Sequence, residues 1–467
     1  MATATIHRIV VLFDKALTAL SLAVPMADVE SMAILVNRSL AAPTRSFHNS
    51  RHVFQMCEDM KPLQVLAALF HDVVYCQVDK GFPAPAVQLL SGVTDAKDEG
   101  LSLRPFEPGD DSVALCAAVF GFSAGQILPL THGLNEFLSA VVACRLLQRH
   151  LSGPQMLAVV VGIAATVPFR ARDARGQSAA DKLAQRVLSH ITSAEAALDA
   201  NTPQTLAWVK DVITDAVTLA NRDVAGFTDA DPRQCLTNTW LLLKESNPAL
   251  QLAGVYGLQE LRQALQRTDA FLGQLKPALV CQSYAAYPSA AMGVALALAT
   301  EQNLRFSRDY LAIELCFIAI IEALALETGG DCPAALFLGD NQSADGDAVG
   351  VNDNLPLPAL RPGLSAELLD LLDQAHVPGA FNDLSISPLK PWVYRWMGQT
   401  GIQQGVQRAR QMFDGTLLPQ DFLKALDQQM LLAVIGVCRE NAPSRRQALL
   451  NLASRIQTNH LGQNAVL

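Results

Sequence analysis

The chain has 467 residues, of which 50% are hydrophobic and 17% charged, and its net charge at pH 7 is −9. This acidic charge argues against a nucleic-acid or anionic-membrane partner. No apolar run reaches the roughly 18 to 20 residues that a membrane span needs, and the first twenty residues lack the pattern of a signal peptide. We therefore expect a cytoplasmic protein with a large interior, and its mean hydropathy of +0.22 favours a homo-oligomer.

Helical periodicity dominates the first half of the chain. Two helices are predicted within residues 1–40, and Pro62 suits the first turn of a later one. Residues 76–134 are rich in turn formers and acids, which predicts a long insertion or lid with one short helix or strand near residues 113–120. Beyond it, Asn135 is a predicted N-cap. Further helices are predicted at 156–166, at 179–199, from Pro203 and from Pro232.

The second half also reads as helical, apart from residues 328–363, whose Gly, Asp, Asn and Pro content predicts a mobile loop. No strand-like alternation is strong anywhere, so the predicted fold class is all-α. We divide the chain into 1–247 and 248–467. The second region has no recognisable motif and could serve as a dimerisation body, a regulatory domain or a wall of a pocket. The nine cysteines are scattered, which predicts reduced and mostly buried thiols.

The residues with the most evident chemistry lie between His48 and Asp72. His48 and His52 are four apart, so on a helix both imidazoles would lie on one face, one turn apart. His71 and Asp72 interrupt an apolar run that would otherwise be a buried helix. Adjacent helical positions point about 100° apart, so the two share a target only where the helix meets a cleft. Burying such a pair without a partner is costly.

Three motifs in this chain, HNSRH at 48–52, FHDVVY at 70–75 and NEFLSA at 135–140, together resemble the HD-domain superfamily of metal-dependent phosphohydrolases. The resemblance covers about residues 45–230 and implies an HD-like helical bundle, to which 248–467 adds a further helical region. The segment 76–134 is much longer than in the small members of that superfamily.

The resemblance also implies a metal site. His52, His71 and Asp72 match the ligand positions, and a fourth ligand should be an Asp on a later helix. We choose Asp223, because it lies near the end of a strongly periodic helix among apolar neighbours. The rivals are Asp181, Asp229 and Asp231; the last two lie in a stretch, TDADP, that is typical of a helix-capping turn.

Two imidazoles and two carboxylates form a mixed nitrogen and oxygen site that suits divalent Mn, Fe, Zn, Co or Ni, and a binuclear site with Mg is an alternative. His48 is placed to protonate a leaving group, Glu136 to orient water or a ligand imidazole, and Arg51 or Arg170 to bind a phosphate. Each has a simpler explanation. His48 could be a surface or capping residue, and Asp223 could be an ordinary helix-end acid. Glu136 could be a first-turn acid favoured by the helix dipole, and Arg170 could be a solvated loop charge.

These expectations favour hydrolysis of a phosphoester or phosphodiester of a small molecule, with a nucleotide as one candidate. Two alternatives stay open. An HD-type di-iron oxygenase would need further imidazole ligands, for which only His132, His150 and His190 are at hand. A non-catalytic HD scaffold in signalling or protein interaction would need no metal.

Overall fold

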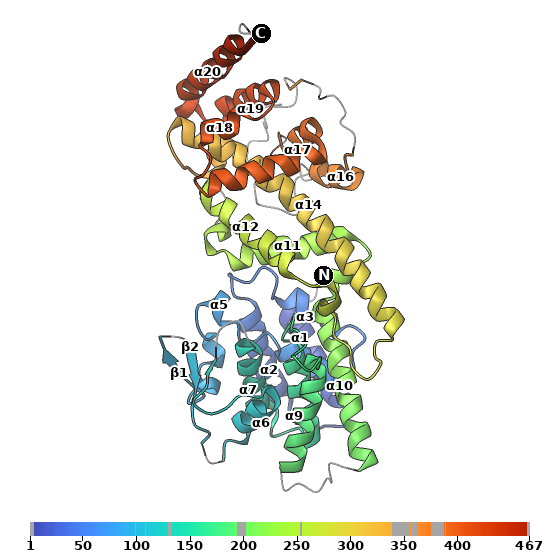
Figure 1. The fold of residues 1–467 in the computed structure, drawn as a ribbon. Coiled ribbons are helices and arrows are strands. Elements are labelled where there is room, and N and C mark those ends of the chain that lie inside the picture. The colour runs from blue at the N-terminus through green and yellow to red at the C-terminus, as the bar shows by residue number, and fades with distance from the viewer. Residues whose placement is uncertain are drawn as a thin grey trace. The chain divides into compact units, whose positions relative to one another are not determined.

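The computed structural model describes residues 4–464 except 99, 108, 129–132, 194–201, 253–254, 339–354, 357, 359–362, 375–386 and 388. The chain is mainly helical (Figure 1), which confirms the predicted all-α class; the strands in the described residues form one small sheet. Within the same residues, no helix combines the length and the hydropathy that a membrane crossing requires. The chain divides into two compact units, one of residues 1–230 with 275–303 and one of 231–274 with 304–467.

The first unit holds the candidate site. Its helices are α1 (Thr5–Ala19), α2 (Met26–Leu40), α3 (Ser50–Cys57), α4 (Pro62–Phe70), α5 (Cys76–Asp79), α6 (Asp111–Phe120), α7 (Leu134–Leu147), α8 (Gly153–Ala165), α9 (Ala179–Ser193), α10 (Pro203–Asp223) and α13 (Pro277–Val280), with short 3-10 helices η1 (Ala84–Ala86), η2 (Gln88–Leu90) and η3 (Ala225–Thr228). Pro62 and Pro203 begin α4 and α10 as predicted, and the Thr202 side chain caps α10 by accepting from the Thr205 N–H.

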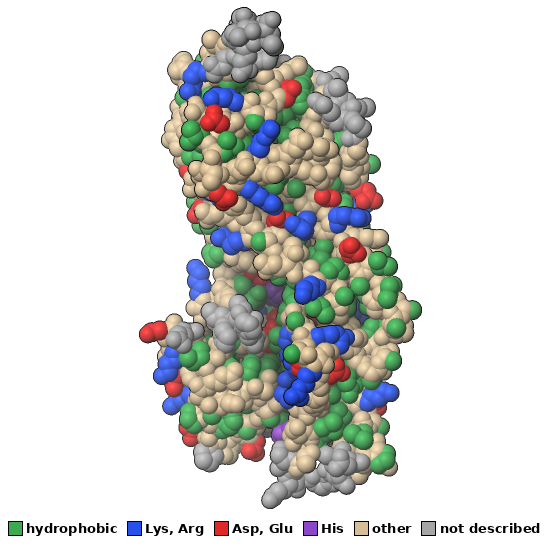
Figure 2. All heavy atoms as spheres, viewed as in Figure 1, with side chains coloured by type: hydrophobic (Ala, Val, Ile, Leu, Met, Phe, Trp, Pro, Cys, Tyr) green, Lys and Arg blue, Asp and Glu red, His purple; other side chains and the backbone are tan. Residues whose placement is uncertain are grey.

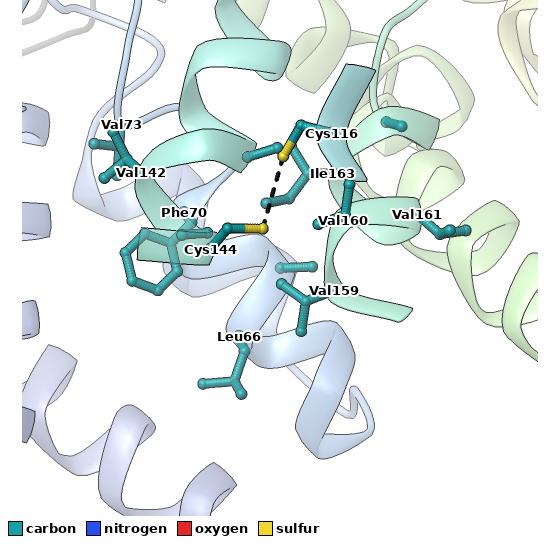
Figure 3. Packing of buried hydrophobic residues seen from close by; sticks show 14 of the residues in the cluster. Leu66, Phe70, Val73, Cys116, Val142, Cys144, Val159, Val160, Val161 and Ile163 are labelled. Carbon is teal, nitrogen blue, oxygen red and sulfur yellow. Dashed lines mark hydrogen bonds between the residues drawn. The ribbon is translucent and has the colours of Figure 1, made fainter. Parts of the chain in front are cut away.

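Helices α4 and α8 form the centre of the core. Both helices are apolar on nearly all sides, because both are surrounded by other helices. Helix α8, for example, contacts α4, α7, α9 and α10 and leaves almost no face to solvent. Figure 3 shows Leu66 and Phe70 of α4 beside Val159 and Ile163 of α8. In the same cluster, the buried thiols of Cys116 and Cys144 lie 3.7 Å apart as free cysteines, in agreement with the expected reduced state.

Gly162 allows α4 and α8 to approach closely, since a Cβ added to it would lie 2.9 Å from the Cβ of Ala67. We predict that Gly162→Ala lowers the free energy of unfolding by roughly 1–3 kcal/mol through overpacking, although alanine is the better helix former. Gly153, at the start of the same helix, has no neighbour within 4 Å. Gly153→Ala is therefore the control and should be neutral or stabilising. Urea unfolding measures both, and equal effects would contradict the prediction.

The segment 76–134 is more regular than predicted. Besides α5 and α6, it contains the strands β1 (Thr94–Lys97), β2 (Gly100–Leu103) and β3 (Ile127–Leu128), paired antiparallel in the order β1-β2-β3. In this register Thr94 faces Leu103 and Leu101 faces Leu128. Helix α6 matches the short element expected near 113–120, but its buried face packs on α7 and α9. That part of the segment belongs to the core, and is no lid.

The boundary between the units differs from the predicted division at 247. Residues 231–247 group with the second unit, and residues 275–303 return to the first. The returning segment is tied to α10, where the Asn221 side chain and the Gln282 backbone exchange two hydrogen bonds of 2.7 and 3.0 Å. The Gln282 side chain donates to the carbonyl of Ala165 at the end of α8. Part of the region left unassigned by the sequence therefore packs against the unit that carries the site.

The second unit is mainly helical in its described part. Its elements are α11 (Pro232–Ser246), η4 (Pro248–Gln251), α12 (Leu258–Gln274), the later part of α14 (Ala290–Thr328), α15 (Ala334–Leu338), α16 (Ala366–Gln374), α17 (Leu389–Phe413), α18 (Pro419–Lys424), α19 (Gln428–Asn441), η6 (Pro443–Arg445) and α20 (Arg446–Asn464). Buried acids of α14 are paired: Glu314 with Lys390 and Glu322 with Arg262, each at 2.8 Å. The predicted mobile loop at 328–363 lies mostly outside the described residues.

Candidate metal centre

His71 and Asp72 converge because they follow the end of α4. The last residue of α4 is Phe70, and His71 is its C-cap, with its N–H bonded to the carbonyl of Ala67. Asp72 lies in the turn beyond, so the 100° offset between neighbouring helical positions no longer separates the two side chains. The His71 Nε2 and Asp72 Oδ2 atoms are 2.8 Å apart. Their convergence therefore comes from the helix end, whereas the sequence argument placed it on a helix face.

His52 and Asp223 complete the cluster from two other helices. His52 is buried on α3, and its Nε2 lies 2.9 Å from Asp223 Oδ1 and 4.0 Å from Asp72 Oδ2. Asp223 is the last residue of α10, and its Oδ1 lies 3.9 Å from His71 Nε2. One ligand atom each of His52, His71 and Asp72 lie within 4.8 Å of one another. The structure thus brings together all four predicted metal ligands.

Hydrogen bonding sets the tautomer of His71. Its Nδ1 lies 2.8 Å from the carbonyl oxygen of Ala68. A carbonyl accepts only, so Nδ1 carries a proton and, in the neutral ring, the Nε2 lone pair points at Asp72. Within the described residues, His71 Nε2 and Asp72 Oδ2 are buried without a hydrogen-bond partner despite their 2.8 Å approach. Two such orphaned electron-pair donors aimed at one point fit a cation, and an imidazole held by a backbone carbonyl is the usual arrangement of a metal ligand.

Electrostatics also favours a positive charge at this point. Burial would raise the pKa of Asp72, but the imidazoles of His71, His48 and His52 outweigh it and hold that pKa well below its usual range. Burial lowers the pKa of His71, and the carboxylates of Asp72 and Asp223 reverse the effect and raise it to about 9. The Asp72 carboxylate thus stays ionised and attracts positive charge to this point.

His48 lies beside the cluster, although it is not on the helix. Helix α3 begins at Ser50, and Asn49 is its N-cap, with an extended backbone and a side chain that accepts from the Arg51 N–H. The expectation that His48 and His52 share a helical face is therefore wrong, because the helix begins between them and His48 lies before it. The turn still brings the His48 ring to 5.9 Å from that of His52, edge-on to the Tyr75 ring at 4.6 Å.

Helix α7 explains the motif NEFLSA. Asn135 is not the N-cap as predicted; Gly133, with φ of 86°, takes that place. The Asn135 side chain instead accepts from the Cys76 N–H at 3.0 Å, and Ser139, one turn later, accepts from the Val74 N–H at 3.0 Å. The two side chains hold the segment that follows Asp72, and so they tie FHDVVY to α7.

Glu136 faces the centre from the first turn of α7. Burial raises its pKa to about 7, and the nearby carboxylates of Asp72 and Asp223 add to the shift. A carboxyl group with this pKa exchanges protons near neutral pH, which suits it to acid or base chemistry.

The raised pKa of Glu136 predicts a pH-dependent stability. Between its ordinary value of 4.5 and about 7, the folded chain holds a proton that the unfolded chain has lost. Stability therefore falls as the pH rises through this window and stays low above it. In metal-free protein, Glu136→Gln should match the wild type at pH 4.5 and exceed it by about 3 kcal/mol at pH 8. Urea unfolding with a chelator measures this, and a difference independent of pH would contradict it.

The two predicted phosphate-binding arginines differ in position. Arg51 is exposed on the first turn of α3. Arg170 follows α8 and is half-buried, and its Nη2 donates to the carbonyl of Ala164 at 2.9 Å. Burial lowers the pKa of Arg170, and the Glu136 carboxylate opposes that shift, which places Arg170 near the centre. Arg170 is thus the better placed of the two.

The rival acids have other roles. Asp181 accepts from the N–H and hydroxyl of Ser178 at the start of α9, and Asp231 caps α11 by accepting from the Arg233 N–H. Asp229 lies in the turn between η3 and α11, where its backbone carbonyl accepts from the Asn303 side chain. These contacts agree with the reading of TDADP as a capping turn.

Sequence reasoning missed Arg45 and Asp79. The Arg45 side chain is fully buried, and its guanidinium makes a two-pronged contact with Asp79 of α5, Nε to Oδ1 at 3.1 Å and Nη2 to Oδ2 at 2.6 Å. Its Nη1 donates to the backbone carbonyl of Asp72, and Nη2 lies 3.4 Å from that of Val73. Arg45 therefore fixes the turn that carries a predicted ligand. No motif marks it in the sequence.

The histidines considered as additional ligands lie elsewhere or are not described. His150 pairs with Asp28 at 3.3 Å, and His190 is half-buried on α9. His132 lies outside the described residues.

Comparison of the chain with models of protein families, with curated proteins and with solved structures gives no match.

Proposed function

We propose that this chain is a metal-dependent phosphohydrolase of the HD type that acts on a small phosphorylated molecule. One observation carries the proposal: the buried, unpartnered His71 Nε2 and Asp72 Oδ2 atoms converge at 2.8 Å, with His52 and Asp223 beside them. The motifs shared with the HD superfamily support the same reaction class.

The donor set fits a divalent transition metal. His52, His71, Asp72 and Asp223 would supply two imidazole nitrogens and carboxylate oxygens, which suits Mn, Fe, Zn, Co or Ni. A bound ion of this kind lowers the pKa of a coordinated water and neutralises charge on a phosphoryl oxygen. A second, oxygen-rich position for Mg stays part of the proposal.

The remaining residues supply proton transfer and substrate binding. His48, held edge-on against Tyr75 beside Asp72, would protonate the leaving alkoxide. Glu136, with a pKa of about 7, would accept a proton from the attacking water or orient it. Arg170, near Glu136, would bind a phosphate oxygen.

The test is hydrolysis of phosphomonoesters and phosphodiesters by purified protein loaded in turn with Mn, Fe, Zn, Co and Ni. We expect turnover with at least one metal, and its loss in Asp72→Ala with the helical circular dichroism retained. Undiminished turnover in that variant would refute the proposal. Metal uptake with oxygen consumption and no hydrolysis would favour the oxygenase alternative, and absence of metal uptake would favour a scaffold.

A further inference from the structure

Two arginines of the first unit carry buried nitrogens without a partner. Among the described residues, Arg170 Nε and Arg186 Nη2 are buried donors that have no hydrogen-bond acceptor. An unsatisfied buried donor is destabilising, and more so on a charged group. Each guanidinium is anchored through another of its nitrogens, so the orphaned N–H groups are held in place.

The anchors place both arginines where three helix ends meet. Arg186, on α9, donates through Nε to the carbonyl of Val119 near the end of α6 at 2.6 Å. Arg170 donates to the carbonyl of Ala164 at the end of α8. The third end is the start of α7, which carries Glu136.

Packing contacts show that these ends adjoin one another. The rings of Phe120 and Phe122, at the end of α6, lie 5.6 and 5.3 Å from the ring of Phe137, the residue after Glu136. A Cβ added to Gly133, the N-cap of α7, would lie 3.1 Å from Val167, three residues before Arg170. Arg170 and Arg186 therefore border the metal centre on the side of Glu136. Figure 2 shows Lys and Arg side chains along one margin of a furrow in the first unit, with histidine inside it.

The charges in this corner are unbalanced. Burial and the neighbouring Arg170 lower the pKa of Arg186 to about 10. Burial also lowers the pKa of Arg170, and the carboxylate of Glu136 opposes that shift. Two guanidiniums close together repel each other, and a doubly charged anion would remove that repulsion.

We propose that Arg170 and Arg186 form a binding subsite for a phosphate dianion beside the metal centre, so that the chain prefers phosphomonoesters to phosphodiesters. A monoester presents two negative charges and three free oxygens, enough for both guanidinium groups, whereas a diester presents one charge and two oxygens. The preference rests on the proposed function, but binding of the anion does not.

The first test uses inorganic phosphate as the probe, with metal-free and metal-loaded protein in isothermal titration calorimetry. We expect the metal-free wild type to bind phosphate, and Arg170→Gln and Arg186→Gln each to weaken that binding at least about tenfold. Lys182→Gln is the matched control, because Lys182 lies one turn from Arg186 on α9 and pairs with Asp173 at 3.1 Å. It removes the same charge and should leave phosphate affinity unchanged.

The outcomes separate this inference from the proposed function. No phosphate binding by the metal-free wild type, or equal affinity in the wild type and both arginine variants, would overturn the subsite. Metal uptake should be the same in all variants, which shows that the arginines act on the anion. A wild type that binds phosphate at the arginines but takes up no metal would refute the proposed function alone.

The second test measures the substrate preference once hydrolysis is established. For 4-nitrophenyl phosphate and its bis-ester, Arg186→Gln should reduce kcat/KM for the monoester at least about tenfold more than for the diester. Arg186→Lys keeps the charge and should recover part of the loss. Equal losses on both substrates would overturn the preference.

Discussion

Replacement of both His71 and Asp72 by alanine should leave the purified protein without bound transition metal. The change removes two of the four donors, including both orphaned atoms, and should reduce metal affinity by more than the roughly 100-fold that loss of an outer partner costs. The apo fold should persist, because removing both members of a buried charged pair is far cheaper than removing one. Elemental analysis after reconstitution with Mn, Fe and Zn measures the metal content per chain.

The matched control is the double variant His150→Ala with Asp28→Ala. His150 and Asp28 form another histidine–aspartate pair of the first unit, with 3.3 Å between Nε2 and Oδ2, but Asp28 is 44% exposed. This control should bind as much metal as the wild type. Equal metal content in the wild type and the His71 and Asp72 variant would contradict the assignment of the centre.

The helices could be predicted where the chain carries local start signals. Pro62, Thr202 before Pro203, and Asp231 before Pro232 begin helices as expected, since a capping side chain and a proline act within a few residues. Asn135 carries the same signal but does not cap its helix, because its side chain accepts from the N–H of Cys76 in the segment after Asp72. Which N–H the Asn135 side chain accepts from is decided by tertiary packing.

The strands and the unit boundary could not be read from the sequence. The strands β1 and β2 are four residues each, TDAK and GLSL, too short and too irregular for a two-residue alternation to appear. The return of residues 275–303 to the first unit depends on contacts such as that of Gln282 with Asn221, sixty-one residues apart. No local pattern encodes a contact of this range.

In the candidate site, too, some residues could be predicted from the sequence and others could not. His52, His71 and Asp72 could be proposed because they lie close together in the sequence and match a spacing, and Asp223 because its helix is strongly periodic. Arg45 and Arg186 could not, because each acts through backbone carbonyls of other segments. Backbone carbonyls are present at every position, so they leave no mark in the sequence.

Arg45→Ala should destabilise the first unit strongly and also weaken metal binding. It removes the partner of Asp79, whose side chain is only 8% exposed, and leaves the carbonyls of Asp72 and Val73 without their donor. Breaking a buried ion pair from one side costs roughly 3–5 kcal/mol. Because the same guanidinium fixes the backbone of Asp72, metal affinity should fall at least about tenfold.

Two further variants separate lost positioning from lost charge. Removing Arg45 and Asp79 together should cost less stability than Arg45→Ala alone, because no buried charge remains unpaired, yet metal affinity should stay low, since the carbonyl of Asp72 still lacks its donor. Arg45→Lys keeps the charge without the two-pronged geometry, so its stability and metal affinity should lie between those of the wild type and of Arg45→Ala. The surface pair of Lys61 and Asp215, at 2.7 Å with Lys61 67% exposed, is the control; Lys61→Ala should cost about 0–1 kcal/mol. Urea unfolding and metal titration measure these effects, and full recovery of metal affinity in the double variant would show that Arg45 supports the fold without positioning Asp72.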